Sequence, residues 1–303
     1  MSVFAAFAFV LLLMALGRLL SWRRLVPDSA PDALNIVVLY VYMPAAILLQ
    51  VPKLQLTGAT LGVALVPWML LAASTLLVLG AARLLNLQRP DTAVLLLEVP
   101  LGNTSFLGYA LIPVLASPEA MPFAVLFDQF GSFLILSTFG LTVIAIYSGG
   151  ARPTPAVVLR RVVSFPPFLA LVFALTLMPA EPPREIADVL QQLASAMLPM
   201  VGIALGMQLR LRLPRAQLLP LGLGLAGKLV LMPALAWALC LLLDFEPAAR
   251  SAVVLEAAMP PMITAAALAA MARLAPELGS ALVGYGVVLS MLSLPFWRWW
   301  LGY

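Results

Sequence analysis

Long apolar stretches separated by short polar connections make up nearly the whole chain. A helix that crosses a bilayer needs about 20 consecutive apolar residues. By that measure ten segments qualify as transmembrane spans: 3–20, 34–51, 60–82, 92–115, 121–147, 163–180, 187–209, 216–243, 248–272 and 277–301. The pattern predicts an all-α polytopic membrane protein with ten transmembrane helices.

Two of the ten spans are interrupted by proline at matching places in the two halves of the chain. Span 4 contains Pro100, and span 9 contains Pro260 and Pro261. Unwound backbone is tolerated at membrane depth only where it is buried in protein or lines a cavity. A matched pair of interrupted spans is the sequence signature of a binding site in secondary transporters. Spans 4 and 9 are therefore predicted to be broken helices that cross at a substrate site.

Other prolines indicate an internal repeat. Pro44, Pro67 and Pro100 recur in the same order as Pro199, Pro233 and Pro260, at offsets of 155, 166 and 160 residues. Five spans per copy is an odd number, so the second copy must enter the membrane from the opposite side. The predicted organisation is a first five-helix repeat (1–148), a cytoplasmic linker (149–162) and an inverted second repeat (163–303). The linker, with Pro153 and Pro155, is interpreted as a simple connection.

Basic residues are concentrated in alternate loops. Those after spans 1, 3, 5, 7 and 9 contain Arg18, Arg23, Arg24, Arg83, Arg89, Arg152, Arg160, Arg161, Arg210, Arg212, Arg215 and Arg273. The opposite side has only Lys53, Arg184, Arg250 and Arg298. By the positive-inside rule the odd-numbered loops are cytoplasmic and both termini face outward, across the cell (inner) membrane. The first span has no basic residues before it and is expected to be retained rather than cleaved as a signal peptide.

Composition excludes several classes of function. Hydrophobic residues make up 63% of the chain and charged residues 10%, with a mean hydropathy of +1.07. The basic pI reflects loop charges and not a nucleic-acid surface, because the net charge is only +4. The chain has no histidine and one cysteine, Cys240, so no cofactor, metal cluster or nucleophile–base pair is predicted. Trp297, Trp299, Trp300 and Tyr303 are interpreted as an interfacial aromatic anchor.

The interrupted spans place helix N-termini at the expected crossing. A helix N-terminus carries about half a positive charge and free N–H groups, which together attract anions. Side chains around the two breaks can add hydrogen-bond donors to this site. The predicted substrate-binding residues are Pro100, Gly102, Asn103, Thr104, Ser105, Pro260, Pro261 and Thr264, with Gln129 on span 5 as a further contact. The alternative is that the breaks are packing kinks whose polar groups are satisfied locally.

Four ionisable residues fall inside predicted spans and are candidates for function. Glu98 and Glu256 end the first halves of the two broken helices, where the helix dipole disfavours a negative charge. Together with Asp128 they are predicted to couple transport to an ion, either a proton or sodium. Lys228 is predicted to pair with Asp128 or Glu98, or to face an anionic substrate.

Several segments resemble the auxin efflux carrier family. They are Val37–Leu48 around Pro44, Gly102–Gly108, Gly206–Leu209, Lys228 followed by Pro233, and Ala258–Pro261. The chain is similar to a bacterial member without the long cytoplasmic loop of plant PIN carriers. The resemblance implies a scaffold domain (spans 1, 2, 6 and 7), a mobile transport domain (spans 3–5 and 8–10) and a homodimer. Asn103 matches the family's carboxylate-binding asparagine, whereas Thr264 stands nearest the position of its second asparagine.

The expected function is secondary active, elevator-type transport of a small organic anion. The resemblance implies an auxin-like indole acid, malate or malonate as the carboxylate, and it does not imply a sodium requirement. One alternative is a sodium-coupled carrier resembling bile-acid symporters, which share the crossed ten-span architecture. A second alternative is a membrane sensor that transports nothing.

Overall fold

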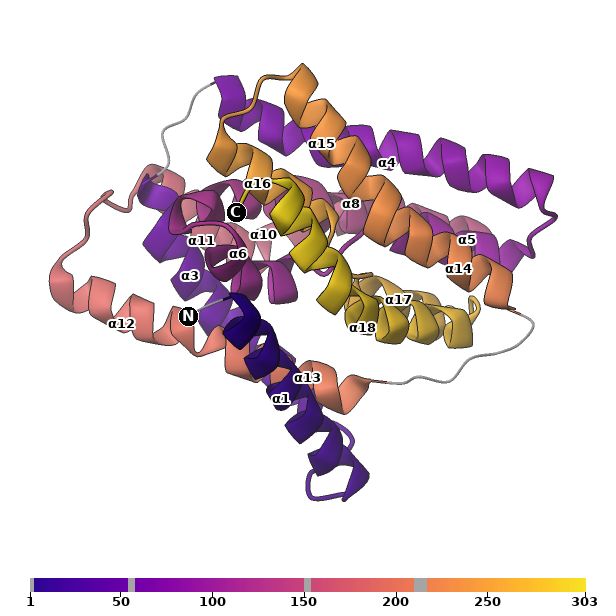
Figure 1. Cartoon of the computed structure of the whole chain (residues 1–303), viewed down its shortest axis with the longest axis horizontal. Helices are drawn as coiled ribbons and strands as arrows, with labels where there is room; N and C mark the ends of the chain where they lie inside the picture. The colour runs from indigo at the N-terminus through magenta and orange to yellow at the C-terminus, as the bar shows by residue number, and fades with distance from the viewer. Residues whose placement is uncertain (1–2, 54–57, 150–153, 210–216) are drawn as a thin grey trace.

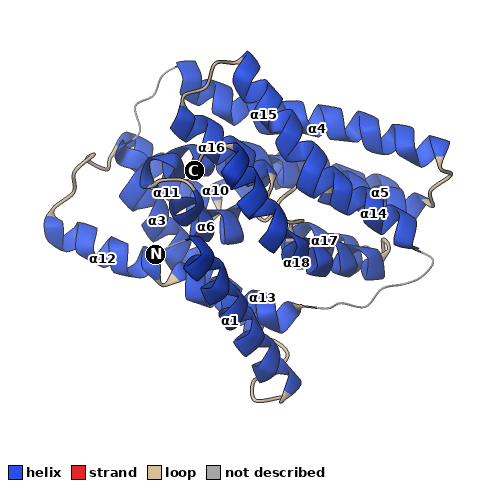
Figure 2. Cartoon of the chain, in the orientation of Figure 1, coloured by secondary structure: helices blue, strands red, loops and turns tan. Residues whose placement is uncertain are grey.

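The computed structural model describes residues 3–53, 58–149, 154–209 and 217–303. The described residues form helices and connecting loops, with one isolated β-bridge between Gly102 and Pro261 (Figures 1 and 2). Arg152, Arg210, Arg212 and Arg215, on which part of the topology prediction rests, lie outside the described residues.

The first half of the chain is a series of α-helices joined by short 3₁₀ and π-helical segments, which are labelled η. In chain order these elements are α1 (Val3–Trp22), α2 (Ala30–Val37), η1 (Val38–Tyr42), α3 (Met43–Gln50), η2 (Val51–Lys53), α4 (Gly58–Leu84), α5 (Arg89–Glu98), η3 (Thr104–Gly108), α6 (Tyr109–Leu115), η4 (Pro118–Ala120), α7 (Met121–Phe127), η5 (Asp128–Ser132), α8 (Phe133–Ile135), η6 (Leu136–Gly140) and α9 (Leu141–Ser148).

The second half continues in the same manner. Its elements are α10 (Pro155–Val163), α11 (Pro166–Thr176), α12 (Arg184–Ser195), α13 (Met197–Gln208), α14 (Leu218–Ala226), η8 (Gly227–Leu231), α15 (Met232–Leu242), α16 (Pro247–Ala257), α17 (Ile263–Met271) and α18 (Pro276–Trp300).

Six continuous helical stretches among the described residues are long and apolar enough to cross a membrane. They correspond to predicted spans 2, 3, 5, 7, 8 and 10. Spans 1 and 6 contain shorter apolar helices, Ala8–Trp22 and Pro166–Thr176. Spans 4 and 9 are each divided into two helices, α5 with η3–α6, and α16 with α17. The protein is an all-helical, multi-pass membrane protein, while the inverted repeat and the crossing within the bilayer stay predictions.

The helices pack in two groups. α1 packs along α13, and α3 packs against α11 and α12. In Figure 1 these lie apart from the long α4, α14 and α15, which pack with α5, α16 and α18. The groups contain the spans that the family resemblance assigns to the scaffold and to the transport domain.

Glycine allows an unusually close contact between α1 and α13. A Cβ atom at Gly17 would overlap the carbonyl of Ile203, and one at Gly206 would overlap the carbonyl of Met14. The two backbones therefore touch directly at both positions. Small residues at helix interfaces permit such an approach in membrane proteins.

Two sequence interpretations need correction. The sequence predicts a simple connection at 149–162, but α10 begins there at Pro155, runs to Val163 and is N-capped by the Thr154 hydroxyl. The interpretation of Trp297 as an interfacial anchor is also wrong: its side chain is buried, and its indole N–H donates a 2.9 Å hydrogen bond to the Leu229 carbonyl. Pro233 has no N–H for that carbonyl, so the indole supplies the missing donor. Trp299, Trp300 and Tyr303 are exposed, as an anchor requires.

Candidate functional site

The two interrupted helices meet through their backbones. The N–H of Asn103 donates a 2.7 Å hydrogen bond to the carbonyl of Pro260, and the N–H of Met262 donates a 3.1 Å bond to the carbonyl of Leu101. These bonds form the bridge between Gly102 and Pro261. They satisfy groups that the proline interruptions remove from helical pairing, which explains how unwound chain is tolerated in the interior.

New helices start directly after this pairing. The carbonyl of Asn103 accepts hydrogen bonds from Leu107 and Gly108 and so begins η3. In the other paired segment, the carbonyl of Met262 accepts a hydrogen bond from the N–H of Ala266, and α17 begins there. Both helical N-termini therefore lie within one or two residues of the pairing, as an anion site between them requires.

A buried charge cluster surrounds the pairing. Glu98 and Glu256 are fully buried, and none of their carboxylate oxygens has a hydrogen-bond partner in the described structure. Lys228 is 1% exposed and interacts electrostatically with both. Its ammonium lies against the unwound segment, because a Cβ atom at Gly102 would be 2.9 Å from Lys228 Nζ. Carboxylates without hydrogen-bond partners are expensive to bury, so this cluster lowers the stability of the fold.

Asp128 belongs to a second cluster, and its hydrogen-bond partners do not include Lys228, for which Asp128, Glu98 and an anionic substrate were the alternatives. Its carboxylate accepts hydrogen bonds from the hydroxyls of Thr104 (2.5 Å), Ser105 (2.7 Å) and Tyr109 (2.9 Å), and from the amide of Gln129 (2.7 Å). Four donors explain how a fully buried carboxylate is accommodated. The cluster fastens the first turn of η3 to the π-helical segment η5.

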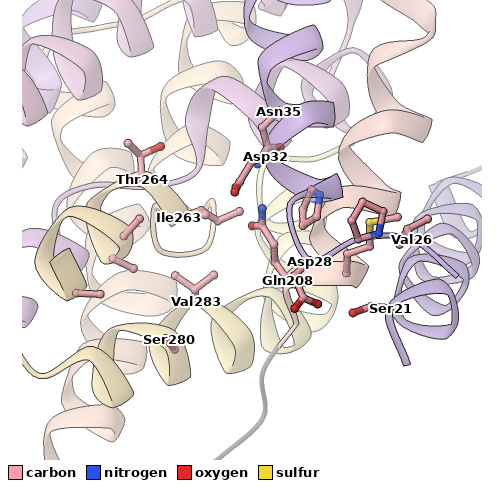
Figure 3. A pocket seen from close by; sticks show the side chains of 16 residues that line it. Ser21, Val26, Asp28, Asp32, Asn35, Gln208, Ile263, Thr264, Ser280 and Val283 are labelled. Carbon is pink, nitrogen blue, oxygen red and sulfur yellow. The ribbon is translucent and has the colours of Figure 1, made fainter. Parts of the chain in front are cut away.

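The remaining predicted residues lie in distinct surroundings. Asn103 is 2% exposed, and its side-chain Nδ2 has no hydrogen-bond partner. Thr264, in the first turn of α17, lines a cavity of about 550 Å³ (Figure 3). Pro100 and Pro260 border the paired segments. The structure thus brings together Gly102, Pro261, Lys228 and the two glutamates, and groups Thr104, Ser105 and Gln129 around Asp128.

Sequence reasoning missed several residues of this region. Tyr109 completes the Asp128 cluster, and Gly108 lies against Glu256, with a would-be Cβ atom 2.6 Å from Oε1. Asp32 and Gln208 line the cavity with Thr264. Gly108 ends the Gly102–Gly108 segment and Tyr109 follows it directly. Both lie one helical turn after Thr104 and Ser105, so helical spacing could have identified them. Asp32 and Gln208 adjoin predicted loops, and nothing in the sequence joins those loops to span 9.

Comparison with known proteins agrees with this architecture. Residues 2–150 and 151–298 match the family described as membrane transport protein. An uncharacterized transporter of Methanothermobacter thermautotrophicus is 29% identical over 293 residues, covering 95% of each chain. An uncharacterized transporter of Methanocaldococcus jannaschii is 24% identical over 304 residues, covering 96% of each.

The fold and these matches define a multi-pass membrane transport protein. More particularly, the chain belongs to the membrane transport protein family of auxin efflux (PIN-like) carriers.

Proposed function

We propose that this protein is a secondary active transporter of a small organic anion whose carboxylate binds where the two interrupted helices meet. The observation that carries the proposal is the backbone pairing of Gly102 with Pro261, which brings two helix N-termini together. Asn103 adds a buried amide donor that has no acceptor of its own. A carboxylate would satisfy that amide and the free N–H groups of the helix ends.

The packing of the helices supports elevator-type movement. The cavity beside Thr264 separates α17 and α18, on the transport-domain side, from the α1–α2 connection and the end of α13, on the scaffold side. The lining residues of the scaffold adjoin loops that the arginine distribution assigns to the cytoplasm. The cavity would accordingly open to the cytoplasm, which makes the present conformation an inward-facing one. We further propose that the protein lies in the cell (inner) membrane and forms a homodimer through its scaffold domain.

The buried glutamates couple transport to protons. Glu98 and Glu256 present two carboxylates to the ammonium of Lys228, and Asp128 is a third buried carboxylate that interacts with Glu256, so neutrality in a nonpolar interior requires further positive charge. A proton meets this requirement without a coordination shell. Sodium would need several oxygen ligands. Coupling to sodium would instead favour the alternative of a carrier resembling bile-acid symporters.

Transport in proteoliposomes tests the proposal. Uptake of labelled malonate and of labelled indole-3-acetate is measured with imposed pH gradients and, separately, with imposed sodium gradients. We expect pH-driven uptake in the wild type that is lost in Glu98→Gln and Glu256→Gln, while Asp188→Asn, an exposed carboxylate on α12, behaves as wild type. Sodium-driven uptake would support the symporter alternative, and absence of flux for a broad panel of anions would support the sensor.

Movement across the cavity is tested separately. In a Cys240→Ala background, Asn35→Cys and Ala267→Cys place one thiol on each side of the cavity. Cross-linking the pair should abolish transport, and reduction should restore it, whereas each single cysteine should be unaffected by the reagent. Full transport by a completely cross-linked protein would exclude relative movement of the two groups.

A further inference from the structure

The helix ends that precede the backbone pairing carry the opposite charge to the helix starts that follow it. α5 ends at Glu98, and α16 ends one residue after Glu256. The last carbonyls of a helix have no intrahelical donor, and the helix dipole places about half a negative charge there. Each of these negative helix ends also carries a carboxylate. This side of the pairing therefore attracts a cation, whereas the starts of η3 and α17 attract an anion.

The two glutamates define a buried site for positive charge. Both side chains are fully buried, and all four of their carboxylate oxygens lack a hydrogen-bond partner in the described structure. Asp128 differs from them, because it already accepts four hydrogen bonds from neighbouring side chains. A buried carboxylate without hydrogen bonds needs a nearby cation or a proton to offset its lost hydration. Glu98 and Glu256 are consequently the carboxylates available to a cation.

Lys228 supplies a positive charge at this site. It is 1% exposed, and it interacts electrostatically with both glutamates. It extends from the π-helical segment η8, and its Nζ and Cε lie 2.9 and 3.1 Å from the point where a Cβ atom on Gly102 would be. The carbonyl oxygen of Met259 lies 3.3 Å from the same point. The ammonium is thus held beside both paired segments, in a region where a free cation would meet carbonyl and carboxylate oxygens.

We infer that the Lys228 ammonium occupies a binding site for a small monovalent cation and takes the place of a dissociable ion there. Because the ammonium is covalently attached, the wild-type protein needs no sodium ion at this position. A short uncharged side chain at 228 removes the charge and frees its space, so the site then binds sodium from solution. The part of this site in coupling rests on the proposed function, whereas the site itself is tested without a substrate.

Thermal unfolding of the purified full-length protein tests the inference. Wild type and Lys228→Ala are compared in sodium chloride and in choline chloride at the same ionic strength, so that charge screening is constant. The two salts should give the same unfolding midpoint for the wild type. For Lys228→Ala, sodium should raise the midpoint by at least about 2 °C over choline, and the shift should saturate with sodium concentration. Radiolabelled sodium should likewise bind saturably to Lys228→Ala and not to the wild type.

Further variants identify the groups responsible. Lys228→Met loses the charge but keeps most of the side-chain volume, so its response to sodium should be smaller than that of Lys228→Ala. Lys53→Ala changes the other lysine of the chain, which is exposed, and should behave as wild type. Adding Glu98→Gln and Glu256→Gln to Lys228→Ala should abolish the response, because the site loses both carboxylates. If Lys228→Ala does not fold in choline, Lys228→Ala with Glu98→Gln alone, which keeps one carboxylate, serves for the same comparison.

The outcomes separate this inference from the proposed function. Equal midpoints in sodium and choline for the lysine variants, with no retention of radiolabelled sodium, would overturn the inference and leave anion transport intact. A specific response of the wild type to sodium would also overturn it, because the ammonium would then not fill the site. Absence of anion flux in proteoliposomes would overturn the proposed function, and the cation site would stand.

Discussion

Gly108 lies directly against the carboxylate of Glu256, at a point where the two halves of the chain meet. A Cβ atom at position 108 would be 2.6 Å from Glu256 Oε1 and 2.8 Å from its Cδ. The glutamate is fully buried, so it has little free space into which it could move. Glycine at 108 is thus required by the position of a side chain that comes from 148 residues further along the chain.

Gly108→Ala should displace Glu256 and abolish pH-driven transport, with a lower thermal unfolding midpoint. Combining it with Glu256→Ala should restore the midpoint but not the coupling, because the clash is removed together with the carboxylate. Gly80→Ala is the control: no atom beyond its own turn of helix lies within 4 Å of its would-be Cβ, and alanine should stabilise α4 by about 0.5–1 kcal/mol. Wild-type pH-driven uptake by Gly108→Ala would show that the contact has no part in coupling.

Lys228→Met should destabilise the protein strongly. Removing one partner from a buried charge cluster costs about 3–5 kcal/mol, because the carboxylates of Glu98 and Glu256 lose the neighbouring ammonium of Lys228. Adding Glu98→Gln and Glu256→Gln to Lys228→Met should recover much of the lost stability. The measurement is the thermal unfolding midpoint in detergent; an unchanged midpoint for the single variant would mean that Lys228 does not stabilise the cluster.

Asn103→Ala should weaken substrate binding without unfolding the protein. Its side-chain Nδ2 has no partner among the described residues, so truncation removes no existing hydrogen bond from that nitrogen. Loss of one hydrogen bond to a carboxylate corresponds to roughly a tenfold rise in the half-saturating concentration of the transported anion.

Thr104→Val provides the contrast to Asn103→Ala. Its hydroxyl donates to Asp128, so its loss should lower the unfolding midpoint. The two variants should therefore separate binding from stability. Unchanged substrate affinity in a stably folded Asn103→Ala variant would remove this residue from the binding site.

Trp297→Phe should lower the unfolding free energy by about 1–3 kcal/mol, because it leaves the buried Leu229 carbonyl without its indole donor. Trp299→Phe is the matched control on the same helix, since Trp299 is 69% exposed and should tolerate the change. Chemical or thermal denaturation of the two variants side by side gives the comparison. Equal midpoints would mean that the hydrogen bond to Leu229 contributes nothing measurable.

Apolar length and proline position predicted much of the architecture. Each of the ten apolar segments contains helix, and helices end at Glu98 and Ala257, just before the prolines that interrupt spans 4 and 9. These features are local consequences of hydropathy and of the missing proline N–H. The α10 helix was missed because its short, basic sequence has no membrane-length apolar run.

The partners of buried polar groups could not be predicted in the same way. Lys228 had three plausible partners, and hydropathy does not distinguish between them. Asp128 is satisfied by hydroxyls on η3 and α6, which come near it only because η3 restarts immediately after the backbone pairing. Trp297 likewise lies in an aromatic-rich segment of the sequence, but in the fold its indole N–H donates a hydrogen bond to the Leu229 carbonyl. Each of these depends on the tertiary contact between helices, which a single sequence does not encode locally.

The double glycine contact between α1 and α13 has a practical consequence for the study of this carrier. Main chain rests on main chain at Gly17 and Gly206, so no rotamer change can loosen the joint and no larger residue can enter it. The joint is consequently a natural frame of reference: probes attached beside it should keep constant separation during turnover, and any distance change measured from it reports motion elsewhere in the molecule.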